Sequence, residues 1–415
     1  MKSRAYRVYL LFKVCFSLLF SMATVLSIVY HLEVVGLNPL QLVLVGTALE
    51  TACFLFEIPT GLVADLYSRR RSVLIGLFLY GAGFLMEGAL PWFGAVLLAQ
   101  VVWGCGDTFI TGALEAWIAS EEQGSPMDGV FLRGSQLSRL GGMAGVVLGT
   151  LLGGISLQLP LILSGALMIA LGCVMMRIMP ETNFRPAVES RKSLIRDAVG
   201  LMRLNLRFAK GAPALLALLG VTLCGGLASE GFDRLSVAHF LNDAVLPAWG
   251  SLNTAVWFGL ISLLSSALSA AAVQILIVRL EKRGSLSRRG WVMFTSAGYM
   301  AGLLLFAAGR NFGFLLVMFL LASVMRALKE PITEAWMNDQ VEERLRASVF
   351  SANGQMDALG QIVGGPLSGL AAQRISTPWG LACTALFMTP VLLLAPLAER
   401  LTGRRGAGRT NEERL

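Results

Sequence analysis

Long apolar runs separated by short polar breaks extend along almost the whole chain. Most runs reach the ~20 residues that a helix needs to cross a bilayer. Within each run the apolar residues are continuous rather than alternating, which excludes a membrane β-barrel. The pattern therefore predicts an all-α membrane protein with about twelve transmembrane helices, at residues 8–31, 40–63, 72–93, 95–119, 134–157, 159–179, 212–238, 250–279, 290–309, 312–337, 349–373 and 378–398.

The longest polar interruption lies in the middle of the chain. It predicts two six-helix bundles, at residues 1–180 and 212–400, joined by a basic cytoplasmic linker at 181–211 and followed by a cytoplasmic tail at 401–415. In the linker, SLIRDAVGLMRLNLRFAK mixes apolar and basic residues at helical spacing. This favours an amphipathic helix on the inner leaflet, and a solvated connector is the alternative.

The two halves share a repeated pattern. Glu-Ala-Trp occurs at residues 115–117 and again at 334–336, which is a spacing of 219 residues. In the same register Val130 aligns with Val349 and Gly141 with Gly360. Such a series indicates an internal duplication, and a pseudosymmetric 6+6 arrangement around a central cavity is expected.

Composition supports a membrane environment. Hydrophobic residues make up 55% of the 415 residues and charged residues 14%, and the mean hydropathy is +0.68. Soluble domains carry about 25% charged residues. The basic N-terminus resembles the start of a signal peptide, but the run at 8–31 is too long for one, so we expect a retained helix.

Lysine and arginine gather on alternate loops: at the N-terminus, at residues 69–71, in the linker, at 282–289 and in the tail. The positive-inside rule then predicts that both termini and the linker are cytoplasmic, in a plasma (inner) membrane. The net charge of +8 follows from this bias. It indicates the lipid bilayer as a partner and no nucleic acid.

The loop after the second predicted helix, in GLVADLYSRRRSVLIG, carries a distinctive charge pattern. It resembles the cytoplasmic loop signature of the major facilitator superfamily, with the signature positions held by Gly61, Asp65, Arg69 and Arg70. Leu66 and Ser68 replace the usual arginine and glycine. The resemblance implies a latch between the two halves, with Glu121 as the expected acidic partner. A cluster that only sets topology is the alternative.

The fifth predicted helix contains a glycine pattern similar to the antiporter signature of the same superfamily, with Thr150 at the usual proline position. Its glycines are Gly145, Gly149, Gly153 and Gly154. The resemblance implies a tight, bendable helix contact at the interface between the two halves, associated with export in exchange for protons. Ordinary small-residue packing is the alternative.

Two charged residues related by the 219-residue register are predicted near mid-membrane. They are Asp107 and Arg326, in the fourth and tenth predicted helices. A charge at the bilayer centre costs at least ~2.5–3.5 kcal/mol and is therefore usually functional. In the fold that the resemblance implies, both helices line the central cavity. We expect the pair to face each other, either as protonatable or substrate-binding groups or as a static ion pair.

Other charged residues are candidates for the substrate and proton pathway, because burial favours the protonated form of a carboxylate. They are Glu50, Glu57, Glu230, Asp233, Arg234 and Glu330. Asp233 and Arg234 are alternatively an outer gate pair.

The repeated tripeptide is expected at an inner gate. Glu115 and Glu334 would lie at the cytoplasmic helix ends, and Trp117 and Trp336 would anchor at the membrane interface. We interpret this element as structural rather than as a substrate site.

These features predict a secondary active transporter that works by alternating access, with proton-coupled efflux of amphipathic drugs or other small molecules as the favoured activity. Arg326 and Lys329 favour, as an alternative, a transporter of a specific metabolite or organic anion. A non-transporting membrane sensor or scaffold is a third alternative. The expected partners are a small-molecule substrate and protons, and the expected state is a monomer.

Several classes are excluded or disfavoured. No nucleophile–base set indicates an enzyme, and no GxxxxGK[ST] loop indicates an ATP-driven pump. With two histidines and cysteines at no ligand spacing, we expect no metal and no cofactor.

Overall fold

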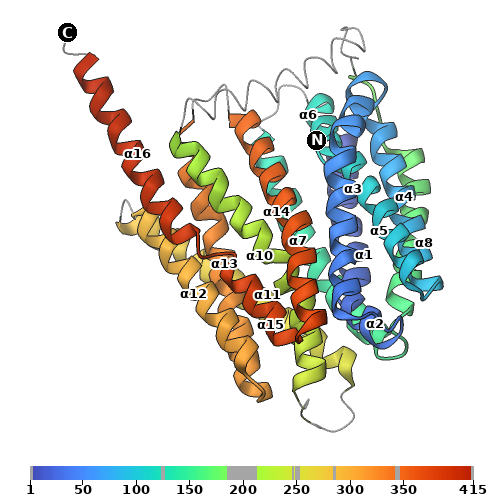
Figure 1. Ribbon diagram of the computed structural model, residues 1–415. Coiled ribbons are helices and arrows are strands. Elements are labelled where there is room, and N and C mark those ends of the chain that lie inside the picture. The colour runs from blue at the N-terminus through green and yellow to red at the C-terminus, as the bar shows by residue number, and fades with distance from the viewer. Residues whose placement is uncertain are drawn as a thin grey trace. The chain divides into compact units, whose positions relative to one another are not determined.

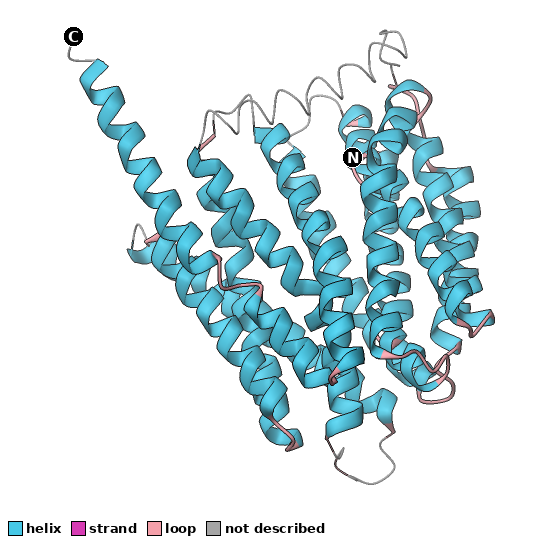
Figure 2. Ribbon diagram, viewed as in Figure 1, coloured by secondary structure: helices cyan, strands magenta, loops and turns pink. Residues whose placement is uncertain are grey.

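A computed structural model of the chain consists of helices joined by turns and short loops (Figure 1). The described residues are 3–122, 127–184, 213–244, 247, 253–283, 287–341 and 346–412, and all their regular structure is helical (Figure 2). The predicted amphipathic helix of the linker falls on residues 185–211, outside the described part. The chain forms two compact units, Met1–Leu194 with Ala248–Leu263, and Ile195–Pro247 with Leu264–Leu415.

The first unit holds eight helices of the described residues and the beginning of α11. They are α1 (Arg4–Thr24), α2 (Ser27–Glu33), α3 (Pro39–Leu66), α4 (Arg69–Ala89), α5 (Phe93–Ile110), α6 (Ala113–Glu121), α7 (Met127–Gly153) and α8 (Leu159–Ile178). The second unit holds α10 (Pro213–Asp243), the rest of α11 (Thr254–Arg283), α12 (Arg288–Ala308), α13 (Phe312–Asp339), α14 (Arg346–Arg374), α15 (Thr377–Leu386) and α16 (Val391–Glu412). Thus α16 extends into the predicted tail.

Each of the twelve predicted apolar runs corresponds to one helix or to one broken helix. Within the described residues, ten such stretches are long and apolar enough to cross a membrane, with α1–α2, α5–α6 and α15–α16 each counted as one. The two helices that complete the set, α7 and α14, are more polar because glycine and charged residues interrupt their apolar sequence.

Three of the predicted helices are broken, where the sequence analysis treated them as continuous. Gly112 separates α5 from α6 with a φ of 78°, a left-handed conformation that favours glycine. Residues 387–390 form a turn between α15 and α16 that ends at Pro390, which has no amide hydrogen to continue a helix. A turn at Val25 and Leu26 separates α1 from α2.

In the first unit, glycines of α7 bring its backbone against the backbone of α1. A Cβ atom on Gly149 would lie 2.6 Å from the carbonyl oxygen of Met22, and one on Gly145 would overlap the carbonyl oxygen of Leu18. Neither position has room for any side chain. The tight helix contact expected from the glycine pattern is therefore present, and it lies inside the first unit.

The end of the glycine pattern differs from the signature that it resembles. A side chain on Gly153 would overlap Leu26, whereas a Cβ on Gly154 would meet no atom closer than 3.2 Å, the nearest being the carbonyl oxygen of Leu151. Thr150, at the usual proline position, donates a hydrogen bond to the carbonyl oxygen of Val146 (2.7 Å). Because threonine keeps its amide hydrogen, α7 continues without a proline kink.

The second unit repeats this packing with α14 against α10. Side chains on Gly360 and Gly364 would overlap the carbonyl oxygens of Leu223 and Leu227. Gly145 and Gly364 are 219 residues apart, but their contacts Leu18 and Leu227 are 209 apart. The first helix of each half therefore follows a register shifted by ten residues, which explains why a gap-free alignment finds no match there.

We expect Gly145→Val to destabilise the protein by at least the ~1–3 kcal/mol that overpacking costs in a close-packed interior. The added methyl groups must displace the backbone of α1 at Leu18. Thermal unfolding of the purified protein in detergent measures the effect. Gly129→Ala, on the same helix where a Cβ meets no atom within 4 Å, is the matched control. Equal melting temperatures for the two variants would contradict the packing described for α7.

Candidate functional site

A cavity with a volume of about 430 Å³ lies inside the second unit, among α10, α12, α13 and α14. Apolar, aromatic and charged side chains all contribute to its wall. The lining residues are Val221, Thr222, Gly225, Ser229, Tyr299, Arg326, Lys329, Glu330, Thr333, Glu334, Phe350, Asn353, Gly354, Asp357 and Met388. Two of the predicted pathway residues, Arg326 and Glu330, and the predicted gate residue Glu334 thus share one site.

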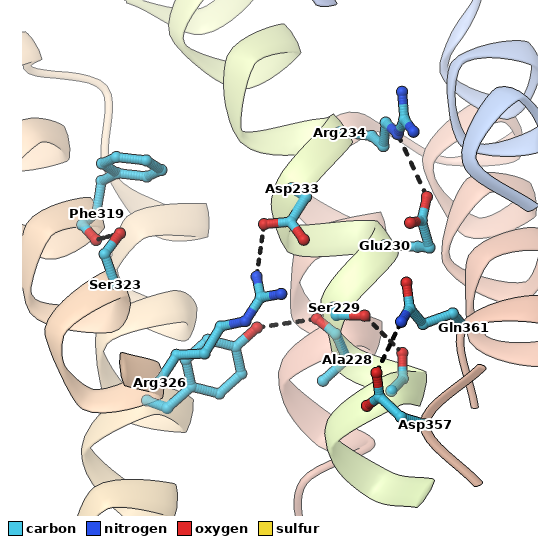
Figure 3. A network of polar contacts seen from close by, with 12 residues as sticks. Ala228, Ser229, Glu230, Asp233, Arg234, Phe319, Ser323, Arg326, Asp357 and Gln361 are labelled. Atoms are coloured by element: carbon cyan, nitrogen blue, oxygen red, sulfur yellow. Dashed lines mark hydrogen bonds and ion pairs between the residues drawn. The ribbon is translucent and has the colours of Figure 1, made fainter. Parts of the chain in front are cut away.

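At one end of this cavity, Arg326 forms an ion pair with Asp233 of α10. Its Nη1 lies 2.5 Å from Asp233 Oδ1 (Figure 3). Its guanidinium carbon lies 5.8 Å from the ring centroid of Phe232. The ion-pair partner of Arg326 is therefore in its own unit. The sequence pattern predicted only Asp107 as the partner of Arg326.

Arg234 makes a separate ion pair with Glu230, at 3.3 Å between Nε and Oε2. Figure 3 shows Asp233 and Arg234 pointing to different sides of α10. The predicted gate pair of these two residues is wrong, because neighbours in a helix face different directions while residues four apart face the same one. Glu230 is buried, with 5% of its surface exposed.

Four charged residues of the cavity have no ion-pair partner among the described residues. Lys329, Glu330 and Glu334 make neither a hydrogen bond nor an ion pair there. Asp357 accepts one hydrogen bond, from Nε2 of Gln361 at 2.8 Å. Arg326 is already paired with Asp233. Three carboxylates, those of Glu330, Glu334 and Asp357, therefore remain for one cation, Lys329.

Asp357 was missed by the sequence analysis, although it lies in the apolar run predicted at 349–373. Its counterpart in the 219-residue register is Ser138, so the repeat drew no attention to it. A carboxylate inside a predicted membrane helix was the signal available.

In the first unit, Asp107 lies beside an aromatic cluster. The hydroxyl of Tyr80 donates a hydrogen bond to Asp107 Oδ1 (2.6 Å), and that of Thr111 donates to Oδ2 (3.3 Å). The ring of Tyr80 packs against four others, those of Phe16, Phe20, Phe84 and Trp103, at centroid distances of 5.1, 6.1, 5.7 and 5.5 Å. Tyr80 corresponds to Tyr299 of the cavity in the 219-residue register, so a tyrosine accompanies both Asp107 and Arg326.

The loop signature is held together by Glu181, just after α8. One oxygen of Glu181 accepts a hydrogen bond from the hydroxyl of Ser68 (2.6 Å) and the other from the amide of Arg70 (2.9 Å). The side chain of Arg70 donates to the carbonyl oxygen of Met176. Ser68 also caps α4 by accepting from the amide of Arg71. Serine in place of the usual glycine thus has a structural role.

Other predictions for this loop need correction. Glu121 accepts hydrogen bonds from Thr182 and from the amide of Asn183 rather than from the arginines. Arg69 lies 4.0 Å from Asp65, four residues earlier, and donates to a backbone carbonyl of α6. A Cβ on Gly61 would meet no atom within 4 Å, so Gly61 makes no close helix contact.

The remaining predicted residues lie on α3 and in the two tripeptides. On α3, Glu50 is half-buried and Glu57 is exposed. Glu115 lies 3.5 Å from Nζ of Lys13. Trp117 and Trp336 are 1% and 4% exposed, so they are core residues rather than interfacial anchors. Trp117 donates to the carbonyl oxygen of Pro180 (2.7 Å).

Comparison with known proteins shows the family of the chain. A sequence model described as Major Facilitator Superfamily matches residues 10–283, which is more than half of the chain. The chain belongs to this superfamily. YxaM and the solved structures described below are transporters. The chain is therefore a polytopic membrane transporter rather than an enzyme.

Among curated proteins, this transporter is 22% identical over 367 residues to YxaM of Bacillus subtilis (strain 168), described as an uncharacterized MFS-type transporter, and the match covers 86% of each chain. A segment of 101 residues is 38% identical to the lincomycin resistance protein of Streptomyces lincolnensis, covering 24% of this chain and 20% of that protein.

Solved structures share the fold at low identity. The nucleoside transporter NupG matches with a TM-score of 0.73 and 16% identity, over 96% of this chain and 99% of the other. A bacterial homologue of the human lysosomal transporter Spinster matches with a TM-score of 0.73 and 14% identity, over 96% and 98%. At these identities the likeness shows the fold alone.

Removing either partner of the Arg326–Asp233 ion pair should destabilise the protein more than removing both. Asp233→Asn leaves an unpaired guanidinium, and Arg326→Gln leaves an unpaired carboxylate, whereas the double variant leaves no charge. Because both side chains are partly exposed, we expect a coupling of about 1 kcal/mol in a double-mutant cycle measured by thermal unfolding. Strictly additive effects would show that the pair does not contribute.

Proposed function

We propose that this transporter exports amphipathic cations in exchange for protons. The observation that carries the proposal is the excess of carboxylates in the cavity of the second unit. Glu330, Glu334 and Asp357 lie in membrane-spanning helices and have no ion-pair partner among the described residues, and an uncompensated charge there is costly. A cationic group or a proton bound there supplies the missing positive charge.

The apolar part of the cavity supports an amphipathic substrate. Val221, Tyr299, Phe350 and Met388 provide a wall on which an aromatic or aliphatic body can pack. The Tyr299 ring additionally attracts a cation. The volume of about 430 Å³ lies within the range of ~300–1,000 Å³ that is usual for sites of drug-sized ligands.

Proton coupling follows if the same carboxylates bind either the cation or a proton. Mutually exclusive occupancy makes release of one depend on arrival of the other, which is the basis of antiport. A membrane potential of ~100 mV acting on one charge supplies ~2.3 kcal/mol. The segment similar to a lincomycin resistance protein is consistent with drug efflux.

The other predictions made from the sequence are part of this proposal. The bundles at residues 1–180 and 212–400 would alternate around a central site, with both termini cytoplasmic in a plasma membrane. Asp107, with its aromatic neighbours, would contribute a second acidic contact from the first unit. The latch between the halves would be made by the charged groups of Asp65, Arg69 and Arg70. Within the first unit, the hydrogen bonds of Glu181 to Ser68 and to the amide of Arg70 would hold this loop in place.

One observation favours a second candidate, a transporter of organic anions. Nζ of Lys329 faces the cavity near Gly225 without an ion-pair partner among the described residues. A carboxylate of a substrate would complete its coordination.

Proteoliposomes with an imposed pH gradient test the proposal. We expect ethidium, a permanently charged aromatic cation, to trigger a proton flux that an internal pH indicator records. Replacing Glu330 or Glu334 with glutamine, or Asp107 with asparagine, should lower the flux at least tenfold because the neutral amides hold neither the cation nor the proton.

Glu33→Gln is the matched control, because Glu33 is an exposed glutamate on α2, outside the cavity. Proton flux with benzoate but not with ethidium, abolished by Lys329→Met, would replace the proposal with the anion transporter. Unchanged flux in all three acidic variants would contradict the assigned site.

A further inference from the structure

A second buried polar cluster lies in the first unit, apart from the loop signature. It consists of His31 of α2, Glu87 of α4 and Gln100 of α5, which are 0%, 1% and 3% exposed. Nε2 of His31 lies 2.8 Å from Glu87 Oε1, and Nε2 of Gln100 donates to Glu87 Oε2 at 2.9 Å. Side chains from α2 and α5 therefore meet at the single carboxylate of α4.

The second unit contains an equivalent helix contact, with phenylalanine in place of Glu87. Tyr30 donates a hydrogen bond to the backbone carbonyl oxygen of Glu87 (2.6 Å). In the second unit, Nε2 of His239 lies 3.0 Å from the carbonyl oxygen of Phe306. Tyr30 and His239 are 209 residues apart, and Glu87 and Phe306 are 219 apart, so the two contacts are equivalent. Nδ1 of His239 pairs with Asp243 of its own helix (2.8 Å). Because phenylalanine stands at the position of Glu87, the second helix contributes no acid to this contact.

The charges of the cluster require one proton. Neutral His31 beside an ionised Glu87 would leave a negative charge in a site closed to water, which costs at least ~2.5–3.5 kcal/mol. A proton on the imidazole or on the carboxylate makes the cluster neutral as a whole. Removing one partner of a buried pair, or its proton, leaves an uncompensated charge that strongly destabilises the packed state.

Among the residues that the structure describes, no other charged side chain is placed to replace that proton. Around the ring of His31, Tyr30 lies at a centroid distance of 5.7 Å, and Glu33 of the same helix is exposed. Lys13 of α1 and Glu50 of α3 are each eleven residues from the helix end nearest the cluster, about 16 Å along the axis. Arg177 belongs to the last turn of α8, at the opposite end of that helix.

Polar side chains of α4 and α5 lie between the cluster and Asp107. Gln100, Trp103 and Asp107 follow one face of α5 at spacings of three and four residues, and Tyr80 and Glu87 lie seven apart on α4. Nδ1 of His31, Oε1 of Gln100 and Nε1 of Trp103 are buried without a hydrogen-bond partner in the described part of the chain. Seven residues correspond to about 10 Å between the two acidic sites.

We propose that His31 and Glu87 form a proton-binding pair of this transporter, which holds one proton while α2 is packed on α4 and releases it when this contact opens. Release sends the proton to solvent and leaves neutral His31 and ionised Glu87. Closure then requires that one proton is taken up again. The seven-residue α2 is separated from α1 by the turn at Val25, so it can move without unwinding α1. The inference rests on the proposed proton coupling.

Nitrogen NMR of histidine tests the pair without any substrate. The chain has two histidines, so ¹⁵N-histidine labelling and a His239→Gln reference assign the ring signals of His31. We expect these signals to change with pH in one step in the full-length protein in nanodiscs. Glu87→Gln keeps the shape of the cluster but binds no proton, so the step should be lost or moved, whereas Glu33→Gln should match the parent.

A parent His31 signal that does not change with pH would overturn the proposal, and this result needs no variant to fold. An identical step in Glu87→Gln would overturn it as well, because the proton would then not be shared with the carboxylate.

Transport separates this inference from the proposed function. In Glu87→Gln the ratio of ethidium movement driven by a pH gradient to ethidium exchange without a gradient should fall at least tenfold. A parent that moves no protons with ethidium, while His31 titrates together with Glu87, would reject the proposed function and keep the pair. Full coupling in Glu87→Gln would reject the pair and keep the proposed function.

Discussion

The contact of glycine faces with neighbouring backbones is the constraint on which the architecture of both units depends. Membrane helices gain little from burying apolar surface, because lipid is as apolar as the protein, and they associate through close packing instead. Gly145 and Gly149 place α7 on the backbone of α1, and Gly360 and Gly364 place α14 on that of α10. The second contact also fixes the cavity, since Asp357 of α14 is held directly over Gly226 of α10.

The two units carry different chemistry on one repeated frame. Tyr80 and Tyr299 occupy equivalent positions, but the first lies beside Asp107 and the second beside Arg326. Glu87 likewise corresponds to Phe306. The first unit therefore holds Asp107 and Glu87 within hydrogen-bonded clusters, and the second exposes carboxylates to a cavity. This division suits a transporter in which proton binding and substrate binding use separate groups.

The helix pattern was predictable from the sequence because apolar runs and positive loops are read directly from composition along the chain. Partners of charged residues were not, since they depend on which helices pack together. Glu181 took the place expected for Glu121, and Asp233 paired with Arg326 rather than with Arg234. The 219-residue repeat indicated positions that are charged in both halves, such as Asp107. It gave no signal for Asp357 and Glu87, whose counterparts are uncharged.

Equilibrium binding of tetraphenylphosphonium to the purified protein, measured by calorimetry over a pH series, tests the central claim most directly. Protons and the cation compete for the carboxylates of Glu330, Glu334 and Asp357. The account therefore predicts tighter binding as the pH rises, and loss of the pH dependence when all three are replaced by amides. Binding that is independent of pH in the parent, or that the triple variant retains in full, would contradict it.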